Sequence, residues 1–379
     1  MKALRVSASV LKILMGVMFI ISASAKFFTI DVFEMYVYSF GLFPMTLTFY
    51  LARFAIVAEL ILGAALISHR NHRFTVLMSL LFLLFFIVFL TYAHFIGRTD
   101  NCNCFGDLME FDPVQSILKN ALLIVILLFV YKYALSDWAP RWWLVLLIYI
   151  ITSLGFLFYT AAVYRYIHTL SISLFIVMIC VGLLASFRFY NRWYVTLVLL
   201  LAPLVAIFIL TPPDSWFYKN SDERFDQQLF SSQILADTAV VADTTIVADT
   251  LLESGEPALL DAGLDQGRHI VTFFSPGCGF CKLAAGKITT IVSRSNIECD
   301  KILYVFPLVP DTSRYEKFYE ESKSSHFVEK RIDKNLFLKI TRGAFPLVVL
   351  VDDGEVKASF AYRNIDEKKM TDFMNGKEL

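Results

Sequence analysis

The sequence contains little charge and no excess of either sign. Only 18% of its 379 residues are Asp, Glu, Lys or Arg, against about 25% in soluble globular proteins. The 34 basic and 34 acidic side chains give a formal net charge of zero. Proteins that coat nucleic acids need Lys and Arg to neutralise phosphates, so the composition excludes that class. With 57% hydrophobic residues, a disordered chain is excluded as well.

The few charges are distributed unevenly along the chain. Residues 1–210 contain 14 basic and 8 acidic side chains, whereas residues 211–379 contain 20 basic and 26 acidic ones. Seven apolar runs fill the first part, and most approach the ~20 residues that a helix needs to cross a bilayer. They cover residues 13–25, 45–67, 74–96, 114–131, 142–163, 166–187 and 193–210. The pattern predicts a polytopic α-helical membrane domain of about seven spans, followed by a soluble half.

The first apolar run has a second interpretation. A basic start followed by an apolar stretch and Ala23-Ser24-Ala25 is also typical of a cleaved secretory signal. With the N-terminus inside, nine Lys and Arg fall in inner segments and four in outer ones, as the positive-inside rule requires. Whether the first apolar run is cleaved or kept as a span, the C-terminal half is therefore expected outside the cytoplasm. We expect a multi-pass protein of a bacterial inner membrane with an extracytoplasmic C-terminal domain.

The second half divides into a spacer and an α/β pattern. The polar composition of residues 211–267 predicts a linker. It contains the tripeptide Ala-Asp-Thr three times at a six-residue period, which is too few repeats for a solenoid. Within 268–379, strands are expected at 269–275, 301–306 and 346–351. Asp353-Gly354 predicts a tight hairpin into a last strand. The expected order is β-α-β-α-β-β-α.

Cys278 and Cys281 are the clearest chemical signal. They follow an apolar strand and open a helix, and a helix N-terminus lowers the pKa of a thiol placed there. The pattern predicts a redox pair in which Cys278 attacks and Cys281 resolves the mixed disulfide. Half of a zinc site and an inert disulfide are the alternatives, although the strand–Cys-x-x-Cys–helix context favours redox chemistry.

Residues 265–379 resemble the thioredoxin superfamily. The resemblance rests on the run Phe273–Lys282 (FFSPGCGFCK) and on Phe345-Pro346 before a late strand. It implies a thioredoxin-like domain in which Pro346 is cis and faces the disulfide. Thr272 stands where the family has a buried acid, and the longer spacing to Pro346 implies an insertion around residues 311–342.

The second cysteine pair, Cys102 and Cys104, lies in the expected outer loop between the third and fourth spans. A disulfide between cysteines two apart closes a tight ring, and strained disulfides tend to be more oxidising. A structural staple in an exposed loop is the alternative. Asp112-Pro113 then predicts an N-cap and the first helical residue of the fourth span.

Residues 5–133 resemble the MauE family of methylamine-utilisation membrane proteins, which belongs with the DoxX-like four-span redox proteins. The resemblance rests on the loop CNCFGD at 102–107 and on span residues, which are Gly16, Phe19, Ile20, Ser22, Lys26, Glu59, Leu62, Gly63, Lys119 and Asn120. It implies disulfide formation in the periplasm beside a thioredoxin-like partner, here fused to the same chain. The first domain is thus expected at 1–133, and three further helices at 134–210 have no assigned role.

Glu59 and Arg53 are ionisable residues inside a span, and such residues are usually functional. They are six positions apart, about 600° of helix, and so do not share a face. Glu59 is a candidate site for a quinone or for a proton released by thiol oxidation; a carboxylic acid hydrogen-bonded between helices is the alternative. No metal site and no firmly bound cofactor is expected, with quinone as the candidate electron acceptor.

Together these patterns predict a membrane-bound thiol–disulfide oxidoreductase that relays electrons between the two cysteine pairs. Its expected partners are the lipid bilayer and periplasmic protein thiols or disulfides, not nucleic acid. An oxidising direction is favoured, because carrying reducing power across the membrane needs a pair of intramembrane thiols and the spans contain only Cys180. A reductive thioredoxin-like system and a non-enzymatic anchored binding module with structural disulfides are the alternatives.

Overall fold

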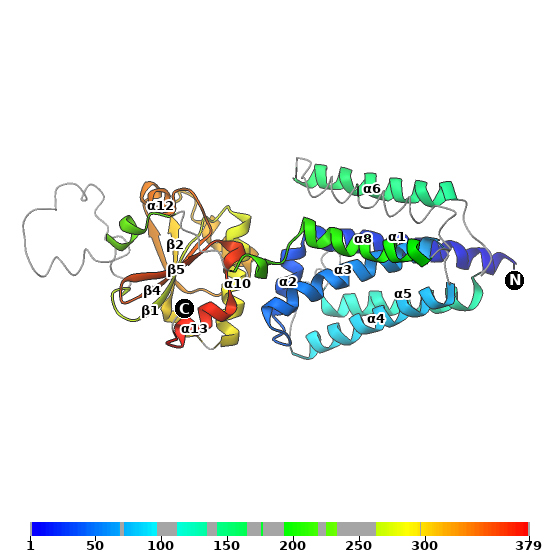
Figure 1. The fold of residues 1–379 in the computed structure, drawn as a ribbon, viewed down its shortest axis with the longest axis horizontal. Helices are drawn as coiled ribbons and strands as arrows, with labels where there is room; N and C mark the ends of the chain where they lie inside the picture. Colours follow the sequence, from blue (N-terminus) through cyan, green and yellow to red (C-terminus); the bar gives the residue numbers. More distant parts are fainter. Residues whose placement is uncertain are drawn as a thin grey trace, which may run out of the picture. The chain divides into compact units, whose positions relative to one another are not determined.

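The computed structural model describes residues 2–68, 72–96, 112–134, 142–164, 176, 193–218, 225–232, 263–295 and 297–377. These residues form two compact units, Met1–Pro213 and Asp214–Leu379. The first unit is helical and the second contains a mixed sheet flanked by helices (Figure 1). Each unit is described by itself below.

The N-terminal unit consists of long apolar helices. They are α1 (Lys2–Phe28), α2 (Ile30–Tyr38), α3 (Met45–Ser68), α4 (His72–Phe95), α5 (Pro113–Tyr133), α6 (Trp142–Tyr164) and α8 (Trp193–Leu210). Four of them, α1, α3, α4 and α5, are long and apolar enough to cross a membrane. They coincide with the first four predicted spans, whereas the total of about seven spans stays a prediction.

Two glycines let α1 and α3 approach each other closely. A Cβ atom added to Gly16 would lie 2.8 Å from the carbonyl oxygen of Gly63, and one added to Gly63 would lie 2.8 Å from that of Gly16. Small residues at such crossings are typical of helix packing in membranes. Both glycines belong to the MauE-like pattern, so part of that pattern has a packing role.

Apolar side chains cover the outer surfaces of these helices. Phe85, Phe95 and Leu118 are 66%, 82% and 65% exposed, whereas the charged Lys26 and Arg53 are buried. This arrangement is the reverse of that in a soluble protein and suits a lipid surround. The N-terminal unit is therefore a multi-pass membrane domain.

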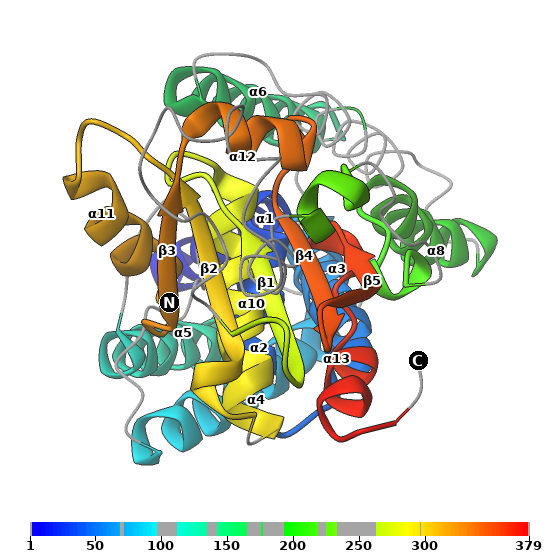
Figure 2. The same cartoon turned by 90° about the vertical axis from the view of Figure 1, so that its left-hand side faces the viewer.

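The C-terminal unit is built on a five-stranded sheet of order β3-β2-β1-β4-β5 (Figure 2). The strands are β1 (Arg268–Phe273), β2 (Ile302–Pro307), β3 (Val328–Ile332), β4 (Leu347–Asp352) and β5 (Glu355–Phe360). β1, β2 and β3 are parallel, and β4 runs antiparallel to both β1 and β5. The helices are α10 (Gly279–Ser295), α11 (Ser313–Ser322), α12 (Lys334–Thr341) and α13 (Glu367–Met374).

Successive side chains of the central strands point to opposite faces of the sheet, and both faces are buried. Val271 and Phe273 pack in one core cluster with Phe337 of α12. On the other face, the hydroxyl of Tyr304 in β2 donates to the carbonyl oxygen of Ala285 in α10, at 3.3 Å. The helix that carries the cysteines thus lies on the face opposite α12. This is the thioredoxin-like arrangement that the sequence predicts.

β3 was not predicted from the sequence, whereas the turn between β4 and β5 was. β3 has the sequence VEKRI and lies at the edge of the sheet with most of its side chains partly or fully exposed. Charged residues are common on edge strands because they oppose further pairing, so no apolar run marks it. The predicted hairpin at Asp353-Gly354 is confirmed, and both residues have positive φ angles, 48° and 80°, as a type I′ turn requires.

Parts of the segment predicted as a linker belong to the folded C-terminal unit. Phe225 and Phe230 are buried in the core beside Phe273, and residues 214–218 contact α10 and α13 through hydrogen bonds and ion pairs described below. Only Pro212 and Pro213 separate Thr211, which is bonded within the first unit, from Asp214. The aromatic residues in this otherwise polar stretch explain the difference. The Ala-Asp-Thr hexads lie outside the described residues.

Candidate active site

Cys278 is the N-cap of α10. The chain leaves β1 at Phe273 and turns so that the Cys278 N–H donates to the carbonyl oxygen of Ser275, at 3.0 Å. The Cys278 carbonyl oxygen then accepts from the N–H of Lys282, at 3.2 Å, as in the first turn of a helix. The thiol of Cys278 therefore faces N–H groups that the helix itself leaves without partners.

The structure gives the two cysteines different environments. The Cys281 N–H donates to the Cys278 sulfur at 3.3 Å, and the Ser275 N–H donates to the Cys281 sulfur at 3.5 Å. Cys281 is fully buried, whereas Cys278 is partly exposed; both are free thiols. A client sulfur can therefore reach Cys278, and Cys281 can meet only a sulfur that is already bonded to Cys278.

The hydrogen bonds favour the thiolate form of Cys278. The Cys281 thiol donates to it, and with the backbone N–H groups of Cys281 and Phe280 and the nearby Lys282 ammonium it outweighs partial burial and lowers the pKa of Cys278 to about 6. Burial raises the pKa of Cys281 well above its usual value, and the bond to Cys278 raises it further. These differences agree with the predicted roles, attack by Cys278 and resolution by Cys281, which stay predictions.

This difference predicts the pH dependence of alkylation. A thiol of pKa about 6 is about half ionised at pH 6, whereas one of pKa 9 is about 0.1% ionised there. Iodoacetamide should therefore modify Cys278 of the reduced chain with a midpoint near pH 6, and faster as the pH rises through it. Mass spectrometry of the Cys278 peptide measures the rate.

Two controls identify the cause of that midpoint. In guanidinium chloride the profile of Cys278 should move to the ordinary thiol range, because the helix is lost. In Cys281→Ala it should move upward, because the donating thiol is removed. A midpoint that stays near pH 6 in both would assign the low pKa to something other than these hydrogen bonds.

The structure shows a cis peptide bond before Pro346 and places Thr272 in β1, whereas the expectation that Pro346 faces the cysteines stays a prediction. The Phe345–Pro346 bond is cis, as predicted, and Pro346 is buried. Thr272 is fully buried in β1, and its hydroxyl donates to the Leu303 carbonyl oxygen at 3.3 Å. No carboxylate therefore stands at this position, and a proton leaving Cys281 must be taken up by another group.

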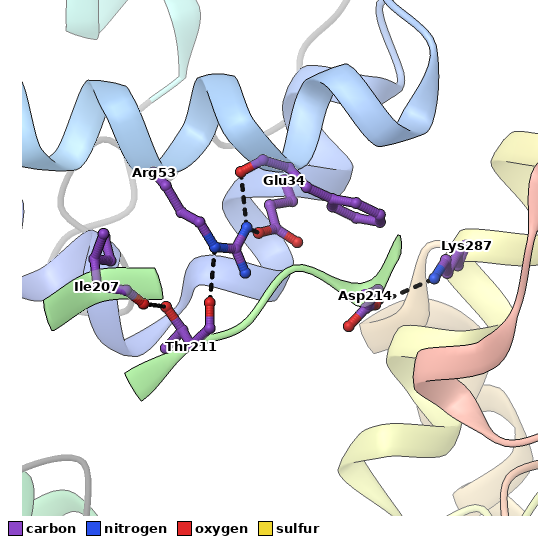
Figure 3. Close-up of polar contacts among 7 residues, drawn as sticks. Glu34, Arg53, Ile207, Thr211, Asp214 and Lys287 are labelled. Atoms are coloured by element: carbon purple, nitrogen blue, oxygen red, sulfur yellow. Dashed lines mark hydrogen bonds and ion pairs between the residues drawn. The ribbon is translucent and has the colours of Figure 1, made fainter. Parts of the chain in front are cut away.

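The C-terminal unit contains a buried ion pair that the sequence did not reveal. The Lys287 ammonium on α10 is fully buried and lies 3.2 Å from a carboxylate oxygen of Asp214 (Figure 3). The same ammonium lies over the rings of Tyr218 and Tyr362, at 5.8 and 5.5 Å. Asp214 fell within the predicted linker; the only signal for it was the aromatic run Trp216-Phe217-Tyr218 that follows.

Tyr362 contacts both the Lys287 ammonium and the cysteine motif. The Tyr362 ring lies 5.7 Å from that of Phe280, the residue between Gly279 and Cys281, and Phe280 itself is 57% exposed. Lys369 of α13 also donates to the Tyr218 carbonyl oxygen at 2.6 Å. Residues 214–218 thus contact α10 and α13, and Tyr362 contacts the redox motif.

In the N-terminal unit, Arg53 and Glu59 do not pair with each other, as their spacing predicts. Arg53 forms an ion pair with Glu34 of α2 and donates to the carbonyl oxygen of Thr211 at 2.7 Å (Figure 3). Glu59 accepts from the buried ammonium of Lys26 on α1, at 2.7 Å. The structure thus shows Glu59 bonded between two helices, in an ion pair with Lys26, and its role with a quinone or a proton stays a prediction.

Cys102, Cys104 and Cys180 lie outside the described residues. The predicted start of the fourth span, which follows Cys102 and Cys104, is confirmed. Asp112 is the N-cap of α5, its side chain accepts from the Gln115 N–H at 2.7 Å, and Pro113 is the first helical residue. Cys299 is exposed on a short 3₁₀ helix.

Comparison with known proteins identifies similarities to both units. Residues 4–133 match the model of a family described as methylamine utilisation protein MauE. Over 341 residues, 79% of this chain and 78% of the other, the sequence is 26% identical to protein TlpB of Flavobacterium psychrophilum. A solved thiol:disulfide interchange protein from a Bacteroides species is 19% identical, with a TM-score of 0.24, over 30% of this chain and 78% of that one.

The match to the MauE family model and the geometry of the second unit confirm two predicted parts of the chain, the MauE-like membrane segment and the thioredoxin-like unit. The first four apolar helices carry the MauE-like segment, and the second unit has the thioredoxin-like order of strands, cysteine motif and cis-proline. A partly exposed thiolate backed by a buried thiol is an arrangement for thiol–disulfide exchange. Both observations agree with the predicted class of oxidoreductase.

Proposed function

We propose that this protein is a membrane-bound, extracytoplasmic oxidoreductase that forms disulfides in periplasmic proteins. The observation that carries the proposal is the pair of unlike thiols at the start of α10, with Cys278 ionised and accessible and Cys281 buried. A thiolate stabilised in this way favours the reduced form of the pair, which makes its disulfide an oxidant.

The reaction that we propose exchanges one disulfide for another. A client thiolate attacks the sulfur of Cys278 in the Cys278–Cys281 disulfide, the S–S bond to Cys281 breaks, and the thiolate released there takes up a proton from solvent. The second client thiolate attacks the client sulfur of the mixed disulfide and releases Cys278 as thiolate. The client loses two electrons to the chain. Its low pKa makes Cys278 the better leaving group in this last step.

The reduced pair must then lose its two electrons, and we propose Cys102 and Cys104 as the next station. Maturation of periplasmic proteins, including those of methylamine metabolism that give the matched family its name, is the expected setting. The distribution of Lys and Arg supports an outer position for both pairs. Alkylation of intact spheroplasts with a membrane-impermeant reagent checks on which side of the membrane Cys278 lies. An outer Cys278 must react although the cells are not lysed.

Trapping of mixed disulfides tests the proposal. Cys281→Ser should accumulate covalent complexes between Cys278 and client proteins in cells, because the attack of Cys281 on the mixed disulfide, which frees the client again, is lost. Cys278→Ser should accumulate none, since Cys281 is fully buried. Non-reducing gels followed by mass spectrometry identify the bound proteins.

The pattern of trapping separates the alternatives. Equal trapping by both variants would overturn the assignment of roles, and absence of trapping by either would favour a binding module with structural cysteines. A reduction potential of the Cys278/Cys281 pair near that of thioredoxin, about −270 mV, would favour a reductive system instead.

A further inference from the structure

The Lys282 side chain connects the cysteine motif with helix α11. Lys282 is the fourth residue after Cys278, so both lie on the same side of α10, and its backbone N–H donates to the Cys278 carbonyl oxygen at 3.2 Å. The Lys282 ammonium forms an ion pair with the carboxylate of Glu321, one residue before the end of α11. The one charged side chain in the run Phe273–Lys282 therefore has a partner on a separate helix.

Backbone contacts hold the end of α11 against α10. A Cβ atom added to Gly286, one turn after Lys282, would lie 2.9 Å from the carbonyl oxygen of Ser322. The Ser325 N–H also donates to the hydroxyl of Thr289 in α10, at 3.0 Å. The backbone next to Glu321 is thus fixed beside α10. Since α11 lies within the segment expected as an insertion, residues 311–342, that segment brings a carboxylate to the redox motif.

Glu321 is ionised at the pH values at which Cys278 titrates. The Lys282 ammonium lowers the pKa of the Glu321 carboxyl below its usual value, and Lys317 lies 3.7 Å from the other carboxylate oxygen. Lys282 is also one of the groups that lower the pKa of Cys278 to about 6. The field of a carboxylate opposes that of an ammonium beside it, so a paired lysine stabilises a nearby thiolate less than an unpaired one does.

We propose that Glu321 is a positioning residue, which holds the Lys282 ammonium against α11 and so limits how far that charge stabilises the Cys278 thiolate. This rests on the proposed function, in which the stability of the thiolate sets how strongly the Cys278–Cys281 disulfide oxidises its clients. α11 therefore moderates the oxidising strength of the pair. Without the Glu321 carboxylate, the disulfide becomes a stronger oxidant and Cys278 a better leaving group.

The pH profile of alkylation tests the proposal on the reduced, full-length chain. In Glu321→Gln the midpoint of the Cys278 peptide should fall by about 0.3–0.5 unit, because the Lys282 ammonium is no longer offset. In Lys282→Met it should rise by about the same amount, because that ammonium is lost. The equilibrium of the pair with glutathione at pH 7 should shift toward the reduced pair by about twofold to threefold in Glu321→Gln.

Glu355→Gln provides the matched control. It removes the same charge from another exposed pair, with Lys357 at 2.7 Å, and Glu355 pairs with Asp352, which pairs with Arg268 at the start of β1. The cysteine motif follows the other end of this six-residue strand, about 17 Å away and beyond the screening length of about 10 Å. The Cys278 midpoint should therefore stay within about 0.1 unit. Both glutamine variants should unfold at nearly the unmutated temperature, since each changes only an exposed pair.

The Lys282→Met background shows whether Glu321 acts through Lys282. There, Glu321→Gln should shift the midpoint by less than half of its effect in the unmutated chain. An equal shift in both backgrounds would mean that Glu321 acts on the thiolate directly, and an unchanged or higher midpoint in Glu321→Gln alone would show that it does not limit Lys282. Either result overturns the proposal. Alkylation involves no client, so failure to trap mixed disulfides would instead overturn the proposed function and leave this result standing.

Discussion

Replacing Asp214 by Leu is expected to lower the free energy of unfolding of the C-terminal unit by about 3–5 kcal/mol, the usual cost of leaving a buried charge without its partner. The Lys287 side chain is fully buried and its ammonium lies 3.2 Å from the Asp214 carboxylate. Without that carboxylate the buried ammonium loses the opposite charge that lies beside it in the core. Hydrogen exchange of the β1 and β4 amides in the full chain measures the change.

The double variant Asp214→Leu/Lys287→Met provides the matched control. It removes both charges and keeps the apolar stem of the lysine, so most of the lost stability should return. Lys357→Met, which breaks the exposed pair with Glu355 at 2.7 Å, should cost less than about 1 kcal/mol. A single Asp214 variant as mild as Lys357→Met would show that the Asp214 carboxylate does not stabilise the fold through Lys287.

Features that depend on neighbours in sequence were predicted correctly. The N-cap at Asp112, the turn at Asp353-Gly354 and the position of Cys278 at a helix start each follow from a few consecutive residues. The first four spans followed from long apolar runs, because lipid imposes length and apolarity on every crossing helix. These signals are local, so no knowledge of the packing was needed to find them.

Features that depend on pairing across the chain could not be predicted. The helical angle between Arg53 and Glu59 excluded a bond between them, but it could not supply Lys26, which lies 33 residues before Glu59. Glu34, the partner of Arg53, belongs to the short helix α2, which no apolar run marks. Ion pairs between helices depend on packing that one sequence does not specify.

The start of the C-terminal unit was missed for a related reason. Polar composition placed residues 211–267 in a linker, yet Asp214 and Phe230 are buried within the folded unit. A carboxylate reads as a surface group unless its buried partner is known, and Lys287 lies 73 residues away. Likewise, β3 carries charges because it is an edge strand, so its composition resembled that of a surface helix.

The double variant Cys102→Ser/Cys104→Ser is expected to slow reoxidation of Cys278 and Cys281 in membranes by about tenfold or more. Thiol exchange passes through a mixed disulfide, so if the loop pair is the next station, no alternative sulfur acceptor of similar reactivity remains. Cys278 suits attack on clients, whereas a pair next to the membrane helices suits a lipid-soluble acceptor. Alkylation of the remaining thiols at timed intervals after reduction measures the rate.

Two further variants show whether the slower reoxidation arises because Cys102 and Cys104 no longer accept electrons from Cys278 and Cys281. Cys299→Ser removes an exposed thiol outside the motif and should leave the rate unchanged. A chain that keeps only Cys278 and one of the two loop cysteines should form an internal disulfide at a rate comparable with reoxidation, since slow cross-linking could arise from proximity alone. If the double variant reoxidises at the unmutated rate, Cys102 and Cys104 form a structural staple, and the thioredoxin-like unit passes its electrons to an acceptor without them.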